Sequence, residues 1–183
     1  MEKATFATGC FWGAEDVFMK IEGVTGTRVG YTGGFRENPG YIEVLSGKTG
    51  HAEAVEVIFD PSVVGYSELL EFFWNLHDPS LTHEELIKQN WDVNDASSLA
   101  GMPEYAGSHY RSSIFYHDEE QRQAAIDSME KMQKSLGPKK KILTEIVPAT
   151  TFYQAEDEHQ HYFEKHADEK GANKCNTGSC LIK

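Results

Sequence analysis

Cys10 stands at a junction where a thiol can become chemically active. It follows Gly9 at the end of the strand-like run 5–8 and precedes a stretch with helical spacing. A thiol in the first turn of a helix faces unsatisfied backbone N–H groups and the positive end of the helix dipole, and both favour the thiolate. The thiolate is the reactive form of cysteine. The alternative is that Cys10 is simply a small, buried apolar residue.

Two large aromatic residues, Phe11 and Trp12, come directly after Cys10. Immediately after a Gly-Cys turn, two such rings cannot both easily point into the core. If one or both line a surface hollow, they form an apolar wall beside the sulfur that suits a small group such as a methyl. The alternative, packing beneath the helix, stays open for one of them.

Glu53 begins the clearest strand pattern in the sequence, residues 53–59. Side chains alternate along a strand, so Glu53 shares its face with the bulky residues Val55, Val57 and Phe59. A carboxyl on that covered face would be partly desolvated, which favours its protonated form and suits a proton donor. The alternative is that Glu53, as the first residue of its strand, lies in water at the edge.

The tail carries two cysteines, Cys175 and Cys180, in a small, polar stretch that also contains Gly178 and Ser179. Thiol exchange needs access and mobility, so the two thiols could meet each other or reach Cys10. Their spacing also resembles half of a zinc site, but no second half is evident. We therefore expect a thiol relay and neither a metal nor a cofactor.

Tyrosines and histidines are more ambiguous. Several tyrosines lie in or beside predicted loops and could polarise a substrate oxygen, and spacing does not select among them: Tyr31, Tyr41, Tyr105, Tyr110 and Tyr116. His159, His161 and His166 lie within one helical pattern, and no pair of them has the spacing of a metalloprotease site.

The elements that must position these residues alternate along the chain. Strands are expected at 5–8, 23–34, 53–59, 111–116 and 143–147, and helices at 14–21, 66–76, 118–136 and 155–165. Residues 33–48 and most of 81–109 are expected to form loops. This order predicts an α/β (α+β) fold, a two-layer sandwich with a mixed sheet, helices packed on it and a ferredoxin-like core. We expect one domain, 1–183, with 167–183 as a flexible, irregular tail.

Composition restricts the function classes. The chain has 183 residues, of which 39% are apolar, enough for one globular core. The net charge of -12 argues against nucleic acid as a partner. The sequence has no run of roughly 18 apolar residues, the length that would predict a membrane span, and no secretory signal is visible. A cytoplasmic location is therefore expected. Three cysteines do not make a disulfide scaffold.

Five blocks of the sequence, spread over nearly the whole chain, resemble the A-type peptide methionine sulfoxide reductase family. They are the Gly-Cys-Phe-Trp-Gly run 9–13, the segments 30–31, 41 and 46–53, the run 73–79, the Tyr-Arg-Ser run 110–112, and residues 152–160. The resemblance implies an α/β fold and the thiol-dependent reduction of methionine S-sulfoxide, free or in peptides and oxidised proteins. That activity repairs proteins under oxidative stress.

The same resemblance implies roles for individual residues. Cys10 would attack the sulfoxide sulfur, Phe11 and Trp12 would hold the methyl group, and Glu53 would give a proton to the oxygen. Tyr41 and Tyr110 would donate hydrogen bonds to that oxygen. Cys10 would be left as a sulfenic acid. Cys175 would resolve this acid, Cys180 would carry the disulfide outward, and thioredoxin would reduce it.

One block departs from the family pattern. Family members usually carry a Gly-Asn-Asp-containing segment just before the Tyr-Arg-Ser run, and its Asp supports the site. In this chain that place holds Tyr105, while Asp92 lies 18 residues before Tyr110 and Glu104 is a second substitute. The position of the supporting Asp is therefore left unassigned.

Two other functions also agree with some of these residues. A cysteine hydrolase could use Cys10 with His51 as its base, but Glu53 and the tail cysteines would then have no role. A metal- or peptide-binding module could use the His and Cys residues of the last thirty positions.

Overall fold

The computed structural model describes residues 1–82, 85 and 108–167. Its strands are β1 (Glu2–Thr8), β2 (Val24–Thr32), β3 (Ala52–Phe59), β4 (Ser112–Tyr116), β5 (Glu145–Pro148) and β6 (Tyr153–Gln154). Its helices are α1 (Phe11–Phe18), α2 (Tyr41–Leu45), α3 (Tyr66–Asn75), the 3-10 turn η1 (Ser108–Tyr110), α6 (Glu119–Leu136) and α7 (Tyr162–Lys165). The predicted tail, residues 167–183, begins at the last described residue and lies almost wholly outside the described range. None of the helices described is long and apolar enough to cross a membrane.

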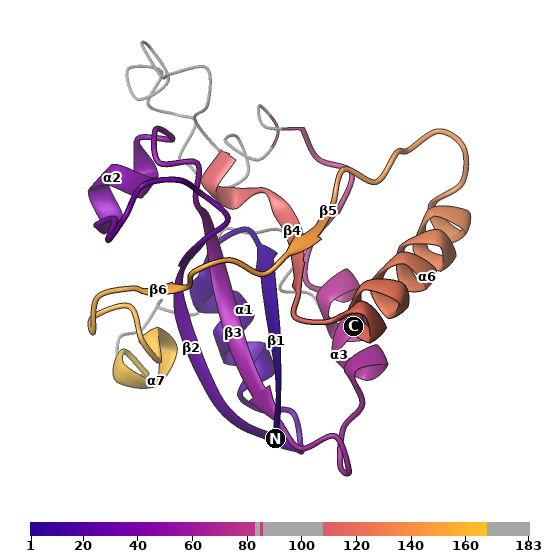
Figure 1. The fold of residues 1–183 in the computed structure, drawn as a ribbon, viewed down its shortest axis with the longest axis horizontal. Coiled ribbons are helices and arrows are strands. Elements are labelled where there is room, and N and C mark those ends of the chain that lie inside the picture. The colour runs from indigo at the N-terminus through magenta and orange to yellow at the C-terminus, as the bar shows by residue number, and fades with distance from the viewer. Residues whose placement is uncertain (83–84, 86–107, 168–183) are drawn as a thin grey trace.

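The strands of the described residues form one sheet in the order β5-β4-β1-β3-β2-β6 (Figure 1). Neighbouring strands pair antiparallel except β4 and β5, which are parallel, so the sheet is mixed. The four inner strands have the order β4-β1-β3-β2, with α1 between β1 and β2 and α3 after β3. This is the ferredoxin-like arrangement, and the predicted fold class is confirmed.

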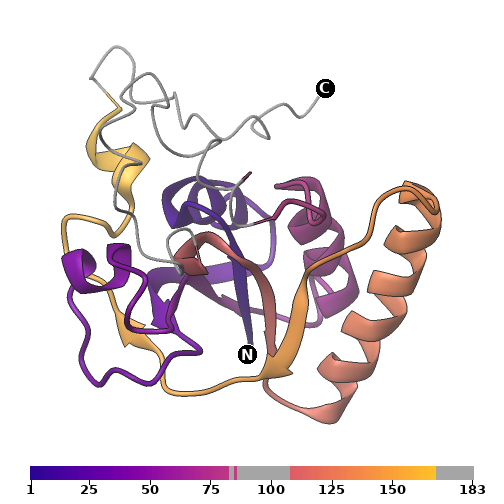
Figure 2. The same ribbon diagram turned by 90° about the horizontal axis from the view of Figure 1, so that it is seen from above.

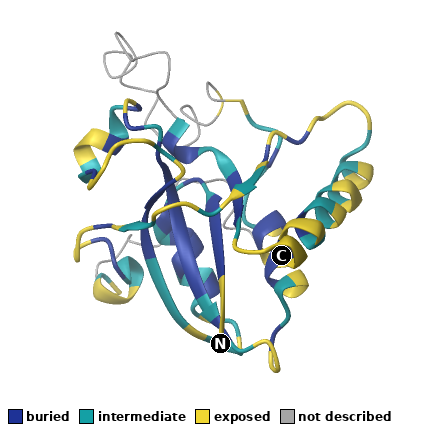
Figure 3. Ribbon diagram, viewed as in Figure 1, coloured by how far each residue is buried: buried dark blue, intermediate teal, exposed yellow. Residues whose placement is uncertain are grey.

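One face of the sheet is covered by helices. Figure 2 shows α1 and α3 on this side, with α6 beside α3. The core between the layers consists mainly of Ala4, Phe6, Val55, Val57, Phe59 and Ile114 from the strands and Phe18, Leu69, Leu70 and Phe73 from the helices. Because β1 and β3 are the central strands, most of their residues are buried (Figure 3). Val55, Val57 and Phe59 therefore face the helices, as their alternation predicts, and Glu53 shares that face.

The opposite face of the sheet has a smaller core. Ala7, Ala52, Ala54 and Phe115 are covered there by the chain around Val147, Ala149 and Phe152. Glu56, the neighbour of Val55 and Val57 on the other side of β3, forms ion pairs with Arg28 at 2.7 Å and with Lys3 at 3.3 Å. The two faces of β3 thus have different chemistry.

The structure differs from the sequence-based expectation in three places. Helix α1 begins at Phe11 rather than at residue 14, because Gly9 has a φ of +102° and turns the chain sharply after β1. The predicted loop 33–48 contains α2, at whose start the side chain of Glu43 accepts a hydrogen bond from the backbone N–H of the N-cap residue Gly40. The predicted helix 155–165 is helical only over Tyr162–Lys165, because His161 has a left-handed φ of +52° and interrupts it.

Candidate functional site

Cys10 lies between the last residue of β1 and the first turn of α1. It is the N-cap residue of α1, with φ −57° and ψ 120°, and it is half-buried. Its side chain therefore stands at the positive end of a helix, beside backbone N–H groups that have no partner within the helix. This is the position that the sequence predicts for a reactive thiol.

Glu53 lies next to this turn. Its side chain is only 1% exposed, which excludes the alternative of a carboxylate in water at the strand edge. Its Oε2 atom accepts a hydrogen bond from the backbone N–H of Phe11 at 3.2 Å. Since Phe11 follows Cys10 directly, the sheet brings a buried carboxyl to the turn that carries the thiol.

The two aromatic residues after Cys10 have different surroundings. Phe11 is 2% exposed and belongs to a small core with Val29, Tyr31, Val44 and Ala155. Trp12 is half-buried, and its ring stacks on Tyr162 with centroids 3.8 Å apart. Phe11 thus packs beneath the site, whereas Trp12 presents part of its ring to the surface.

Tyr41 begins α2 and lies within electrostatic range of both Cys10 and Glu53. Burial, followed by the negative charges of Glu53 and Cys10, raises the pKa of Tyr41 to about 12. Its hydroxyl therefore keeps its proton at neutral pH and can act as a donor. Tyr110 is 8% exposed in η1, which packs against β3. The structure thus places the turn that contains Tyr110 against the strand that carries Glu53.

Glu156 is a site residue that the sequence analysis missed. Its carboxylate accepts hydrogen bonds from the Tyr31 hydroxyl and from the backbone N–H of Tyr41, both at 2.8 Å. Burial alone would raise the pKa of Glu156, but these hydrogen bonds lower it overall. Glu156 therefore joins β2 to α2 as an ionised carboxylate.

His159 and Gln160 were also missed. The ring of His159 lies 4.5 Å from that of Tyr41, between centroids, and Nδ1 accepts a hydrogen bond from Trp12. Gln160 bonds both the N–H and the C=O of Val29. The only available signal was the block 152–160, which the resemblance identified without giving its conformation.

Several predicted residues lie outside the described range. They are Cys175 and Cys180 of the relay, the two candidates for the supporting position, Asp92 and Glu104, and Tyr105, which occupies that position in the family pattern. Among the residues that the structure does describe, no group of three or more His, Cys, Asp or Glu side chains is arranged to hold a metal ion.

His51 is not arranged as a base for Cys10. It is 2% exposed, its Nδ1 accepts a hydrogen bond from the backbone N–H of Gly34 at 3.1 Å, and its Nε2 lies 2.7 Å from the carbonyl oxygen of Arg36. Both ring nitrogens are thus used to hold the loop before α2. This arrangement contradicts the cysteine-hydrolase alternative.

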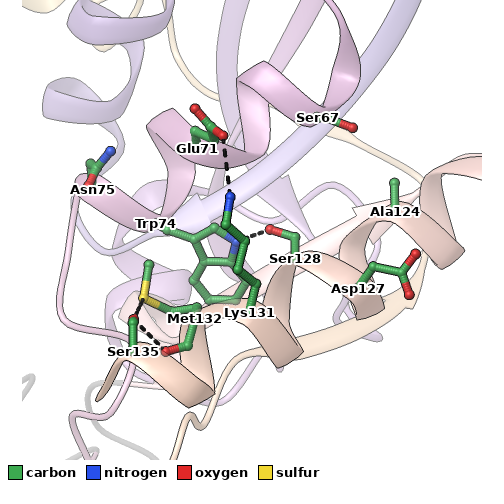
Figure 4. A pocket seen from close by; sticks show the side chains of 10 residues that line it. All are labelled: Ser67, Glu71, Trp74, Asn75, Ala124, Asp127, Ser128, Lys131, Met132 and Ser135. Atoms are coloured by element: carbon green, nitrogen blue, oxygen red, sulfur yellow. Dashed lines mark hydrogen bonds and ion pairs between the residues drawn. The ribbon is translucent and has the colours of Figure 1, made fainter. Parts of the chain in front are cut away.

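A groove of about 480 Å³ lies between α3 and α6, apart from this site (Figure 4). Trp74 forms its floor and donates a hydrogen bond to Ser128, while Lys131 and Glu71 form a 3.9 Å ion pair across it. None of the ten lining residues is a predicted site residue.

The chain matches the family model described as peptide methionine sulfoxide reductase over residues 2–83 and 80–180. It is 53% identical to a peptide methionine sulfoxide reductase MsrA of Methanothermobacter thermautotrophicus, over 90% of this chain and 87% of that protein. Among solved structures it is similar to methionine sulfoxide reductase A of Corynebacterium diphtheriae, with a TM-score of 0.74, 34% identity and coverage of 91% of this chain and 75% of the other. It also resembles Mxr1 from Saccharomyces cerevisiae in complex with Trx2, with a TM-score of 0.55, 25% identity and coverage of 88% and 84%.

Proposed function

The chain belongs to the peptide methionine sulfoxide reductase family, and on this premise we propose how its residues carry out the reaction. The enzyme reduces methionine sulfoxide to methionine with thiol chemistry, and thioredoxin is its reductant. The proposal concerns the residue roles, the S configuration of the substrate and the order of the relay.

Cys10 is the nucleophile and Glu53 is the proton donor. The observation that carries this assignment is the hydrogen bond from the Phe11 N–H to Glu53 Oε2, which holds a buried carboxyl at the turn of Cys10. Burial in an apolar environment favours the uncharged form of a carboxyl, and the helix N-terminus favours the thiolate. The pair therefore supplies a nucleophile for sulfur and an acid for oxygen.

The reductive step balances as an oxygen transfer. The Cys10 sulfur attacks the sulfoxide sulfur while Glu53 gives a proton to the sulfoxide oxygen. The protonated oxygen then leaves the substrate sulfur and bonds to the Cys10 sulfur, while the bond between the two sulfur atoms breaks, so that methionine leaves and Cys10 becomes a sulfenic acid. The substrate sulfur gains two electrons and Cys10 loses two. Tyr41 and Tyr110 donate hydrogen bonds to the oxygen as negative charge develops on it.

Trp12 and Phe11 form the apolar wall for the substrate methyl group. The support is the half-buried ring of Trp12, which lies next to Cys10 and is backed by Tyr162. Phe11 supports this wall from the core side, because its own ring is almost fully covered. A methyl group and an apolar ring attract each other when both leave water.

The relay runs from Cys10 through Cys175 to Cys180. The Cys175 thiol condenses with the sulfenic acid and releases water, and Cys180 then displaces Cys10 to form the Cys175–Cys180 disulfide. Tyr162, which stacks on Trp12, precedes Cys175 by 13 residues (175 − 162), a span that reaches up to about 45 Å when extended. The chain is therefore long enough for either tail thiol to reach Cys10.

We propose that residues 1–183 form one catalytic domain, in which 167–183 is the flexible tail that carries the relay cysteines. A cytoplasmic location agrees with this chemistry, because a disulfide formed in each turnover must be reduced again and cytoplasmic thiols are kept reduced.

The test is mass spectrometry of the protein before and after one equivalent of a methionine S-sulfoxide peptide. We expect the loss of two hydrogens, mapped to one cysteine pair. Cys10→Ser abolishes methionine formation, whereas Cys180→Ser still releases one equivalent of methionine but does not turn over with thioredoxin. Full activity of Cys10→Ser would overturn the proposal.

A further inference from the structure

Two residues of the segment that follows β6 determine how the ring of Trp12 lies. Its Nε1–H group donates a hydrogen bond to Nδ1 of His159 at 3.2 Å. Its flat face stacks on Tyr162, with an interplanar angle of 7° and centroids 3.8 Å apart. The stacking fixes the plane of the indole, and the hydrogen bond fixes its rotation within that plane.

The hydrogen bond defines the protonation state of His159. An indole N–H can only donate, so Nδ1 of His159 must carry a lone pair. The ring is then neutral, with its proton on Nε2. His159 is 4% exposed, and Nε2 has no hydrogen-bond partner within the described part of the chain.

The backbone on either side of His159 holds the ring in place. The side-chain amide of Gln160 forms two hydrogen bonds with the backbone of Val29 in β2 and one with the carbonyl oxygen of Ala155. The backbone N–H of His161 donates to the buried carboxyl of Glu15 at 2.7 Å. On its other side, the ring packs against Tyr41. His159 therefore cannot turn its other nitrogen toward Trp12 without breaking these contacts.

We propose that His159 is a positioning residue, which holds the indole of Trp12 in the orientation that receives the substrate methyl group and releases it when protonated. A proton on Nδ1 would face the indole N–H, so that two donors would meet and the hydrogen bond would be lost. The effect on substrate binding rests on the function proposed above. The hydrogen bond between Trp12 and His159, and its loss on protonation, do not depend on that function.

The surroundings of His159 decide where protonation occurs. The carboxylates of Glu156 and Glu158 lie 3.9 Å from Nε2, and the phenols of Tyr41 and Tyr162 stand nearby on α2 and α7. Burial lowers the pKa of His159, and the two carboxylates oppose this shift without reversing it. The release of Trp12 is therefore expected below pH 6.5, the usual midpoint of a histidine.

The direct test follows the indole N–H resonance of Trp12 by NMR as the pH is lowered. The signal is assigned by its absence in Trp12→Phe. We expect one titration step with a midpoint below 6.5 in the wild type. His159→Gln keeps an acceptor that does not titrate, so the step disappears while the signal keeps its hydrogen-bonded position. His159→Phe removes the acceptor, and the signal shifts at every pH.

His166→Phe is the matched control. His166 also stacks on Tyr162, with ring centroids 4.1 Å apart, but within the described part of the chain it makes no hydrogen bond or ring contact with Trp12, so its loss should leave the titration midpoint unchanged. If the step persists in His159→Gln, or disappears in His166→Phe, the proposal is wrong.

The kinetic arm separates positioning from folding. At pH 8, His159→Phe is expected to raise KM for a methionine S-sulfoxide peptide about fivefold, the usual effect of one lost hydrogen bond, with little change in kcat. His159→Gln should restore KM to nearly the wild-type value. An unchanged KM in folded His159→Phe overturns the positioning role. Turnover by Cys10→Ser would instead overturn the proposed function, whatever the NMR signal shows.

Discussion

The backbone N–H of Phe11 donates a hydrogen bond to Oε2 of Glu53 at 3.2 Å, and this contact ties the start of α1 to β3. The N–H belongs to the first turn of α1, where backbone donors lack partners within the helix. The same carboxyl therefore completes the helix end and lies at the turn that carries Cys10. Glu53 thus makes a structural contact and also has the chemical role proposed above, and substitutions can separate the two.

Glu53→Gln tests the chemical role. The amide oxygen of glutamine can still accept the Phe11 N–H, so α1 should begin at the same residue, but the side chain can no longer act as an acid. We expect the single-turnover rate of methionine formation to fall by about 100-fold or more at pH 7. The measurement is rapid quench of the reaction with a methionine S-sulfoxide peptide.

Glu56→Gln is the matched control. Glu56 is also buried in β3, at 4% exposure, but it faces the other side of the sheet and pairs with Lys3 and Arg28. We expect the rate to change by less than about twofold and the free energy of unfolding to fall by about 1 kcal/mol. A similar loss of rate in both variants would show that Glu53 acts through stability alone.

Tyr41→Phe tests the phenol as a hydrogen-bond donor. The pKa of Tyr41 is raised to about 12 by burial and by the neighbouring Glu53 and Cys10, so its proton stays in place up to pH 10. We expect kcat/KM to fall about tenfold, by the same factor at every pH from 6 to 10. A ratio of wild-type to variant activity that changes between pH 8 and 10 would contradict this expectation. Tyr31→Phe, which removes a hydroxyl bound to Glu156, should reduce stability more than kcat/KM.

Local sequence patterns predicted where the central pair lies in the chain, but they left open whether Cys10 is merely a buried thiol and whether Glu53 lies in water at the strand edge. A glycine turn followed by helical spacing placed Cys10 at a helix start, and the period of two along β3 placed Glu53 on the covered face. Both inferences use neighbours within a few positions, where the geometry of a helix or strand is fixed by the backbone. The ferredoxin-like core follows from the order of these elements in the same way.

The second half of the site could not be predicted, because its geometry depends on distant contacts. Residues 155–161 have helical spacing, yet Gln160 holds this stretch against Val29, which is 131 positions earlier in the chain. Its neighbour His159 is thereby brought into contact with Trp12, and no periodic pattern in the sequence could predict that contact. Local propensity was overridden here by side-chain hydrogen bonds to the buried backbone of β2 at Val29.

His109 should make the stability of the protein depend on pH. It is fully buried, neither ring nitrogen has a hydrogen-bond partner among the residues described, and burial, aided by Arg111, lowers its pKa to about 4. An unfolded chain binds this proton near pH 6.5, so the unfolded state takes it up first as the pH falls. The contribution of His109 to the free energy of unfolding is thus fully present above pH 6.5. It is lost towards pH 4, by about 1.4 kcal/mol per pH unit.

Urea unfolding of the wild type and His109→Phe between pH 4 and 8 measures this contribution. His77, whose pKa burial also lowers to about 4, adds a parallel slope in both proteins, so the difference between the two curves isolates His109. We expect the variant to lose less stability than the wild type as the pH falls. Equal slopes would mean that His109 is not a buried neutral residue.

Gln160→Ala should detach the segment that positions Trp12. Gln160 is 8% exposed, and its amide bonds the Val29 N–H at 3.0 Å and the carbonyl oxygens of Val29 and Ala155, each at 2.9 Å. Its removal leaves these buried backbone groups without partners, which costs about 3 kcal/mol in the free energy of unfolding. Hydrogen exchange at the Val29 amide should accelerate, and KM for the sulfoxide peptide should rise because His159 is no longer held.

Gln123→Ala is the control for the loss of an amide side chain. Gln123 is exposed on α6, and among the described residues its side chain bonds only Asp127, at 2.8 Å, so its removal should change the free energy of unfolding by less than about 0.5 kcal/mol. The amide of Gln160 bonds the buried backbone of β2, whereas the amide of Gln123 bonds a side chain on its own helix. If Gln160→Ala lowers stability but leaves Val29 exchange and KM unchanged, the segment is held by other contacts, and Gln160 contributes only to the general packing.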